Sequence, residues 1–316
     1  MNGPAAELHP VEHAWRRIAG GAAPEAVHDL AHKRGAVAVC AIRDADGDDW
    51  IAKRTGTHAA RLEARLLGDL LPALQVPAPR LLGVVADGAH AWLFFEHLGG
   101  ARYASSDPAH RRLAAQWIAH LHLASSGGLF LQDLPDRGVA WFEQLLAIAC
   151  ARLADLASGC RQPELRAALQ PVVRGAERLR EQWPWLTECV HGDSPVLVHG
   201  DLLTKNARIV HRTSQAGFAA FDWATTAGRG PAAVDLVQGF GRAVTPDLAA
   251  YARERGIAED AARAMAPAGA AMRLARALDW AADSMEGGSG TALIPALQAY
   301  AEELEDLATA ARGTRA

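Results

Sequence analysis

The feature that most constrains this 316-residue chain is a polar stretch that follows a short apolar run. Leu197-Val198 lead into His199-Gly200-Asp201, and Asn206 comes five positions after Asp201. A second carboxylate, Asp222, stands at the end of a later apolar run. Two strands joined by a turn would bring these three polar side chains back to one place. The strand-like segments between them are residues 207–210 and 218–221.

Aspartate, asparagine and aspartate in this order suit a phosphoryl-transfer site. One carboxylate can take the proton of the attacking hydroxyl, while the amide and the second carboxylate can hold Mg²⁺ on nucleotide phosphates. The alternative for Asp222 is a helix-capping aspartate before Ala224-Thr225-Thr226. The His-Gly-Asp triplet alone is a weak signal, because His191-Gly192-Asp193 lacks an asparagine five positions on. We interpret that earlier copy as a loop.

The first third of the chain alternates strand-like runs with turns rich in aspartate and glycine. Strand, Asp/Gly turn and strand in succession predict β-hairpins. We expect residues up to about 30 to be helical, with a first helix at 11–15. Two hairpins (35–42 with 50–53, and 81–85 with 91–96) and one helix (57–71) then complete a first lobe of residues 1–97.

The rest of the chain reads as mainly helical, apart from the polar stretch and its hairpin. Ser106-Asp107-Pro108 places a capping residue and a proline where a helix should begin. The fold class is therefore α+β, with a small antiparallel sheet first and a larger helical lobe at 98–316. The expected helices are 106–125, 139–157, 165–183, 232–241, 246–255, 258–285 and 292–311.

Composition excludes several classes of protein. The net charge of −4 and the lack of a basic block give no reason to expect a nucleic-acid partner. No apolar run is long enough to span a membrane, and the N-terminus lacks the features of a signal peptide, so we expect a cytoplasmic protein. The four cysteines are scattered, which favours free thiols over a zinc or redox site. Oligomeric state stays open.

The polar stretch resembles that of the aminoglycoside phosphotransferase and choline kinase family, relatives of the protein kinases. The resemblance runs from about Gly35 to Leu236 and implies a two-lobed protein-kinase-like fold. It implies that residues 1–97 bind the nucleotide and that 98–316 hold the catalytic and acceptor-binding parts. Asp201 would be the catalytic base, and Asn206 and Asp222 would bind Mg²⁺. The reaction would transfer the γ-phosphate of ATP to a hydroxyl of a small molecule.

Further residues take roles from the same resemblance. Lys53, at the end of a strand, would hold the α- and β-phosphates, with Glu63 on the next helix as its ion-pair partner. Residues 94–98, including Glu96 and Leu98, correspond to the hinge that meets adenine through backbone groups. Asp235, in a segment similar to the family's Gly-x-Pro-x-x-Asp-Leu, would tether a loop. His122 would be a packing or hydrogen-bonding histidine near the catalytic loop.

Two departures from kinase motifs bear on activity. Where a Gly-x-Gly-x-x-Gly loop should stand, the chain offers only residues 33–37, Lys-Arg-Gly-Ala-Val. That departure leaves open the alternative that the chain is a non-catalytic, nucleotide-binding relative of the family. The chain also lacks Asp-Phe-Gly and Ala-Pro-Glu, which argues for a small-molecule acceptor over a protein.

Charge in the last helices bears on the acceptor. Residues 259–306 hold nine carboxylates against three arginines, and acidic walls attract cations. Asp279, Asp283 and Glu286 recur at helical spacing and could share one face. An aminoglycoside or an amino-alcohol is thus the first hypothesis. A sugar, thiosugar or homoserine-like acceptor, uncharged or anionic, is the alternative, and a solvated helix surface also explains most of these residues. We assign the tryptophans Trp183, Trp185 and Trp280 to the core.

Overall fold

The computed structural model describes residues 9–33, 37–211, 216–237, 244–288 and 290–313. Its contacts divide the chain into two compact units. The first unit comprises Met1–Ala101 and Arg208–Thr225, and the second comprises Arg102–Ala207 and Thr226–Ala316. Mixed sheet and helix agree with the predicted α+β class.

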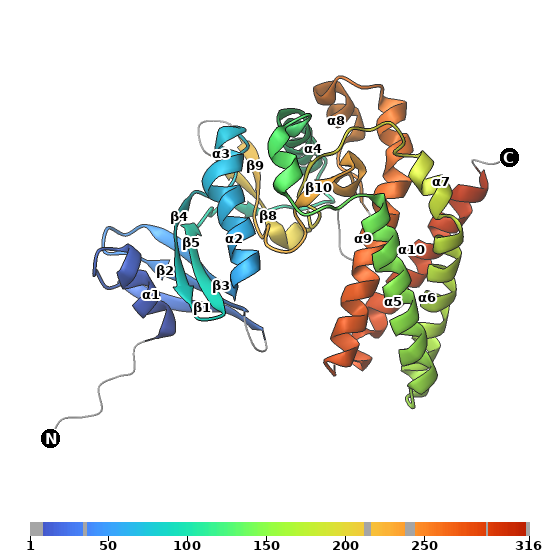
Figure 1. The fold of residues 1–316 in the computed structure, drawn as a ribbon, viewed down its shortest axis with the longest axis horizontal. Coiled ribbons are helices and arrows are strands. Elements are labelled where there is room, and N and C mark those ends of the chain that lie inside the picture. The colour runs from blue at the N-terminus through green and yellow to red at the C-terminus, as the bar shows by residue number, and fades with distance from the viewer. Residues whose placement is uncertain (1–8, 34–36, 212–215, 238–243, 289, 314–316) are drawn as a thin grey trace. The chain divides into compact units, whose positions relative to one another are not determined.

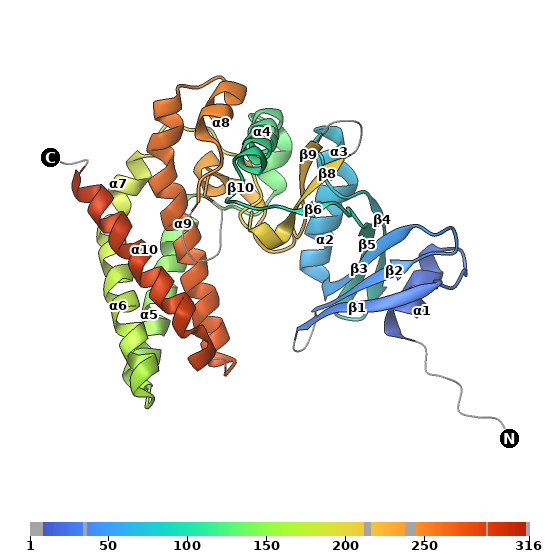
Figure 2. The same cartoon turned by 180° about the vertical axis from the view of Figure 1, so that it is seen from behind.

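The first unit is built on a five-stranded antiparallel sheet in the order β1-β2-β3-β5-β4 (Figures 1 and 2). Both predicted hairpins are present, β2 with β3 and β4 with β5. Strand β3 also pairs with β5, which sets Lys53 opposite Leu93. The bounds are β1 Ala26–Lys33, β2 Val37–Arg43, β3 Asp49–Gly56, β4 Leu81–Asp87 and β5 His90–Glu96.

Strand β1 corrects the prediction that residues up to about 30 are helical. Helix α1 does form at Pro10–Ile18, where the His9 side chain accepts a hydrogen bond from the Val11 N–H. It ends before Gly20 and Gly21, which both have positive φ. The chain then turns into β1 because a partner strand, β2, satisfies its backbone groups. That pairing is a tertiary contact, which local sequence does not reveal.

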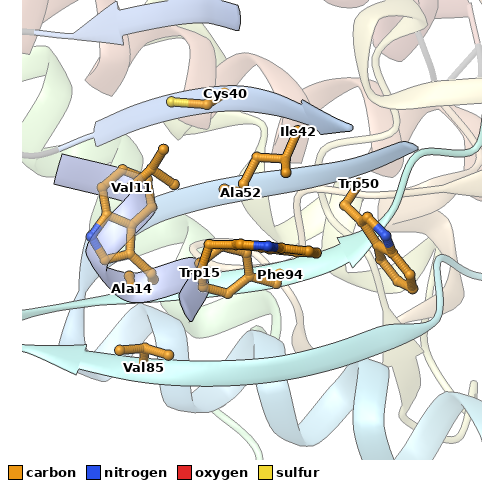
Figure 3. Close-up of a cluster of buried hydrophobic side chains, with 10 residues drawn as sticks. Val11, Ala14, Trp15, Cys40, Ile42, Trp50, Ala52, Val85 and Phe94 are labelled. Carbon is orange, nitrogen blue, oxygen red and sulfur yellow. The ribbon is translucent and has the colours of Figure 1, made fainter. Parts of the chain in front are cut away.

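Helix α1 packs its apolar face against one face of this sheet (Figure 3). The Trp15 ring lies 5.7 Å from Phe94 and 6.4 Å from Trp50, measured between ring centroids. Alternate residues of β3 point to opposite faces. Trp50 and Ala52 therefore join this cluster, and Lys53 faces the other side.

A polar cluster also ties α1 to the sheet. The carboxylate of Asp29 in β1 accepts a hydrogen bond from the Cys40 thiol in β2 and lies 3.3 Å from His9 Nε2. Burial, together with Asp29, raises the pKa of the Cys40 thiol to about 12. The thiol is therefore protonated at neutral pH, in line with the free cysteines predicted.

Helix α2 (Thr57–Arg65) lies in the predicted 57–71 segment and continues through a π-helical turn, Leu66–Leu70, into α3 (Leu71–Ala73). The strand pair predicted between Asn206 and Asp222 is also found: β8 (Ala207–His211) and β9 (Ala216–Ala220) form a three-stranded sheet with β6 (Ala101–Arg102) in the order β6-β8-β9. The turn residues 212–215 lie outside the described residues.

The second unit is mainly helical, as predicted. Helices α5, α6, α9 and α10 lie side by side in a bundle (Figures 1 and 2). A short pair of strands, β7 (Val196–Val198) and β10 (Gly228–Gly230), lies beside α4. The helices are α4 Pro108–Ser125, α5 Val139–Gly159, α6 Pro163–Glu181, α7 Trp183–Glu188, α8 Leu248–Arg255, α9 Glu259–Glu286 and α10 Ile294–Gly313.

One predicted helix is largely replaced. Within the described part of the expected helix 232–241, residues 232–237, the chain forms a 3₁₀ turn, Ala232–Asp235, and residues 238–243 lie outside the described ones. That turn packs closely on α9: a Cβ on Gly269 would stand 2.1 Å from the Ala233 carbonyl oxygen. Among the described helices, none is both long and apolar enough to cross a bilayer.

Candidate active site

The polar stretch directly follows strand β7, which lies in the interior of the second unit. Val196, Leu197 and Val198 are buried, and β7 pairs with β10. The chain then turns sharply at Gly200, whose φ is +74°. A Cβ there would lie 2.8 Å from the Thr226 carbonyl oxygen, so both the backbone conformation and the space require glycine.

The side chain of Asp235 holds this turn through hydrogen bonds to its backbone. Its carboxylate accepts the backbone N–H groups of His199 and Gly200, each at 2.8 Å. It also lies 3.3 Å from Nε2 of the buried His122, whose Nδ1 is 3.0 Å from the Tyr251 hydroxyl. The loop-tethering role predicted for Asp235 and the hydrogen-bonding role predicted for His122 are both confirmed.

Asp201 and Asn206 lie in contact, as their spacing predicts. The amide nitrogen of Asn206 donates to the Asp201 carboxylate at 2.8 Å and to its backbone carbonyl at 3.0 Å. Both bonds use the nitrogen, so the amide oxygen is the Asn206 atom suited to a cation. Carboxylate and amide oxygens are the ligands that Mg²⁺ prefers.

A basic residue that no motif indicates also reaches this loop. The guanidinium of Arg276, on α9, donates to the Gly200 carbonyl oxygen and lies 3.8 Å from the Asp201 carboxylate. With Asn206 on one carboxylate oxygen and Arg276 facing the other, Asp201 is oriented from two sides. Sequence reasoning missed Arg276 because it belongs to no motif and lies on a long helix, 75 residues after Asp201.

Removing that guanidinium should slow the reaction. We expect Arg276→Met to lower kcat/KM roughly 10- to 100-fold, since a charge-assisted hydrogen bond is lost. Arg276→Lys should restore part of the activity, because its ammonium can still reach one of the two oxygens. Steady-state kinetics of both variants would check this. An unchanged kcat/KM in the methionine variant would contradict the positioning of Asp201 by Arg276.

In the first unit, Lys53 lies at the centre of an acidic pair. Its ammonium is 2.7 Å from Glu63 and 2.6 Å from Asp222. The second oxygen of Glu63 accepts the backbone N–H of Trp223. Burial alone would lower the pKa of the Lys53 ammonium, but the two carboxylates outweigh it and the pKa lies above its usual range. The predicted Lys53–Glu63 pair is present.

The backbone of Asp222 is strained. Its φ is +70°, one of two positive values among the described non-glycine residues. Such a conformation costs about 1–3 kcal/mol and often marks a functional site. Residues 224–226 form a turn and no helix begins there, so the capping alternative for Asp222 is wrong.

The remaining nucleotide-site candidates of the first unit lie at the end of β5. The Glu96 carboxylate accepts the Arg80 backbone N–H at 3.1 Å, and Glu96 pairs with Trp50 in the sheet. Leu98 follows the strand and is half-buried. Residues 34–36 of the short candidate phosphate loop lie outside the described residues, as do the side chains of its first and last residues.

The earlier His-Gly-Asp copy has a different role. Asp193 accepts the Ala232 backbone N–H at 3.1 Å and lies 3.9 Å from the Arg255 guanidinium. These contacts tie the loop that carries Asp193 to the first residue of the 3₁₀ turn and to helix α8. They agree with its interpretation as a loop.

The carboxylates of α9 share a face, as their spacing predicts. Asp279, Asp283 and Glu286 all pair with the guanidinium of Arg152 on α5. Sequence reasoning did not find Arg152, because the pairing depends on how the two helices pack. It also placed Trp280 in the core, and this is wrong: the side chain is 45% exposed.

Known proteins resemble this chain in sequence and in fold. The sequence matches the model of the phosphotransferase enzyme family over residues 32–273, and it matches no curated protein. A spectinomycin phosphotransferase, solved with ADP and spectinomycin, has a TM-score of 0.63 at 10% identity, over 92% of this chain and 94% of that one. A choline kinase from Cryptosporidium parvum has a TM-score of 0.55 at 11% identity, over 92% and 89%.

An aminoglycoside phosphotransferase from Alicyclobacillus acidocaldarius gives a TM-score of 0.58 at 16% identity, over 91% of this chain and 92% of that one. At such low identity these structures show a shared kinase-like fold. The family match carries further, because it spans well over half of the sequence. The resemblance seen in the polar stretch is confirmed, and the chain belongs to the phosphotransferase enzyme family.

Proposed function

We propose that this protein is a small-molecule kinase that transfers the γ-phosphate of ATP to a hydroxyl group, with Mg²⁺ as cofactor. One observation carries the proposal: the Asp201 carboxylate is held beside Asn206, after a turn whose backbone N–H groups donate hydrogen bonds to Asp235. A carboxylate so placed suits the removal of a proton from an attacking hydroxyl.

The other residues take complementary roles. Lys53 binds the α- and β-phosphates, and Glu63 keeps its ammonium in place. Asn206 and Asp222 supply oxygen ligands for Mg²⁺, which offsets negative charge on the phosphates when bound. Glu96 and Leu98 belong to the segment that receives adenine through its backbone. The strained Asp222 and the Lys53–Glu63 ion pair favour this enzyme over a non-catalytic, nucleotide-binding relative.

A cationic acceptor is favoured over an uncharged or anionic one. Around Arg152, three carboxylates meet one guanidinium, so the cluster keeps an excess of negative charge. The side chains of Asp283 and Glu286 are largely exposed and can attract a cation. An aminoglycoside or a related hydroxylated amine is the acceptor class that this charge supports.

A panel of acceptors tests the proposal. Purified protein with ATP and Mg²⁺ should phosphorylate at least one of spectinomycin, kanamycin, choline, a simple sugar or homoserine, detected as ADP release with a phosphorylated product by mass spectrometry. We expect the cationic compounds to react, and we expect the neutral sugar and the zwitterionic homoserine to fail. Binding of ATP without transfer to any hydroxyl would sink the enzyme assignment. Transfer confined to sugars or homoserine would sink the charge argument alone.

A further inference from the structure

Three kinds of metal-binding side chain meet where helix α1 begins against the sheet of the first unit. Asp29 of β1 and Cys40 of β2 are cross-strand partners, and His9 immediately precedes α1. One ligand atom from each residue lies within 4.8 Å of the other two. An imidazole, a carboxylate and a thiol together are a donor set that zinc takes in proteins. Because the three residues lie far apart in the sequence, no Cys-x-x-Cys spacing reveals them.

Two distances in this cluster are close to those of a tetrahedral zinc site. The Asp29 Oδ1 atom lies 3.3 Å from Cys40 Sγ and 3.3 Å from His9 Nε2. With metal bonds of about 2.3 Å to sulfur and about 2.1 Å to nitrogen and oxygen, tetrahedral ligands lie about 3.4–3.6 Å apart. The third distance, from His9 to Cys40, is at most 4.8 Å and shortens when the imidazole turns inward.

The strand that carries Asp29 is irregular at this point. Asp29 pairs with Cys40 and Ala31 pairs with Val39, so Leu30 is an extra residue in β1. Such β-bulges re-aim neighbouring side chains and are over-represented next to functional sites. Asp29 and Cys40 stand directly opposite each other, so their side chains reach the same face of the sheet.

That face of the sheet is the one that α1 covers. Cys40 belongs to the same buried cluster as Val11 (Figure 3). In β3 it pairs with Ala52, whereas Lys53 points to the opposite face. Asp29 lies on an edge strand and its side chain is 44% exposed, so an ion from solution can reach the cluster and keep a water as its fourth ligand.

The balance of charge in the cluster favours a dication. In the absence of metal, burial and the Asp29 carboxylate keep the Cys40 thiol protonated. A zinc ion attracts both groups as anions, so Cys40 would release its proton to the solvent and bind as a thiolate. One thiolate, one carboxylate and a neutral imidazole then leave the site without net charge, which suits a partly buried position.

The imidazole of His9 already turns one nitrogen toward Asp29. Its Nδ1 accepts the Val11 N–H at 3.3 Å, which leaves Nε2 beside the carboxylate. Binding through Nε2 moves the ring proton to Nδ1 and gives up the bond from Val11. That bond is long for a hydrogen bond, so a metal bond replaces a weak contact.

We propose that His9, Asp29 and Cys40 bind one Zn²⁺ ion, which fastens helix α1 to strands β1 and β2. Neither Asp201 nor the residues proposed to bind the nucleotide and Mg²⁺ take part, so the zinc site stands or falls separately from the kinase activity. Because the ion binds the folded chain, it should also raise the melting temperature.

Cobalt(II) spectroscopy of the whole chain tests the site, since a bond between Co²⁺ and a thiolate gives a charge-transfer band in the near ultraviolet. With Mg²⁺ in excess, we expect one Co²⁺ per chain to produce this band and Zn²⁺ to displace it. Asp201, Asn206 and Asp222 offer no sulfur, so the proposed magnesium site cannot give the band. Cys40→Ser should abolish it.

Two variants at more exposed positions carry the test even if Cys40→Ser does not fold. His9→Ala and Asp29→Asn should each weaken Zn²⁺ binding at least about tenfold in equilibrium dialysis and cancel the rise in melting temperature. The matched controls are His13→Ala, at an exposed position one turn later on α1, and Cys160→Ser, which removes a thiol of the second unit. Both should bind Zn²⁺ within about twofold of wild type.

Three results would overturn the zinc site. One is a wild-type protein that shows no charge-transfer band at millimolar Co²⁺. Another is a band that survives in Cys40→Ser or disappears in Cys160→Ser, because the ligand would then be a different thiol. The third is an equal loss of Zn²⁺ affinity in the His9 and His13 variants.

Discussion

Asp201→Asn is expected to lower kcat about 10²- to 10⁴-fold while leaving the affinity for ATP nearly unchanged. The amide matches the carboxylate in size, so it can still accept the hydrogen bond from the Asn206 side chain. It cannot take a proton from the acceptor hydroxyl. The loss should therefore appear in the chemical step and not in nucleotide binding. Single-turnover transfer and an independent titration with ATP would measure the two separately.

The chain contains its own matched control for this substitution. Asp193 stands in the same His-Gly-Asp context, yet it contacts Ala232 and Arg255 instead of an asparagine amide. Asp193→Asn keeps an oxygen for the Ala232 N–H, so we expect kcat within about twofold of wild type. Equal activity of wild type and Asp201→Asn would remove Asp201 as the base. Equal loss in both variants would mean that the assay reports loop stability and not base catalysis.

Short-range spacing made much of the candidate site predictable. Asp201 and Asn206 are five residues apart on one loop, and their contact needs no knowledge of distant packing. The pairing of Lys53 with Glu63 is expected only from the family resemblance, because spacing alone does not distinguish Lys53 from a solvated strand residue. The Asp/Gly turns revealed the hairpins β2–β3 and β4–β5, because turn chemistry is local.

Features that depend on tertiary packing could not be predicted. Strand β1 exists because β2 satisfies its backbone, and nothing in residues 26–33 alone distinguishes it from a helix. Arg152 and Arg276 acquire their partners only when α5, α9 and the loop that carries Asp201 come together. The exposure of Trp280 is likewise a result of packing, since an aromatic residue on an amphipathic helix is usually buried.

The buried carboxylate of Asp235 should be the largest single contributor to the stability of the turn at His199 and Gly200. It is only 1% exposed and accepts two backbone N–H groups while contacting His122. Asp235→Ala would leave both N–H groups and the imidazole without this acceptor inside the protein. We expect the free energy of unfolding to fall by about 3–5 kcal/mol, measured by urea denaturation.

Two further variants separate this role from general loss of an aspartate. Asp107→Ala removes an exposed cap of α4, which accepts a single N–H, and should cost only about 1 kcal/mol. Asp235→Asn keeps one acceptor oxygen, so its cost should lie between these values. Because the turn that Asp235 holds also aims Asp201, transfer should fall in the same order as stability, even at temperatures where every variant remains folded. Full activity in a destabilised but folded Asp235→Ala protein would show that the turn holds its shape without this carboxylate.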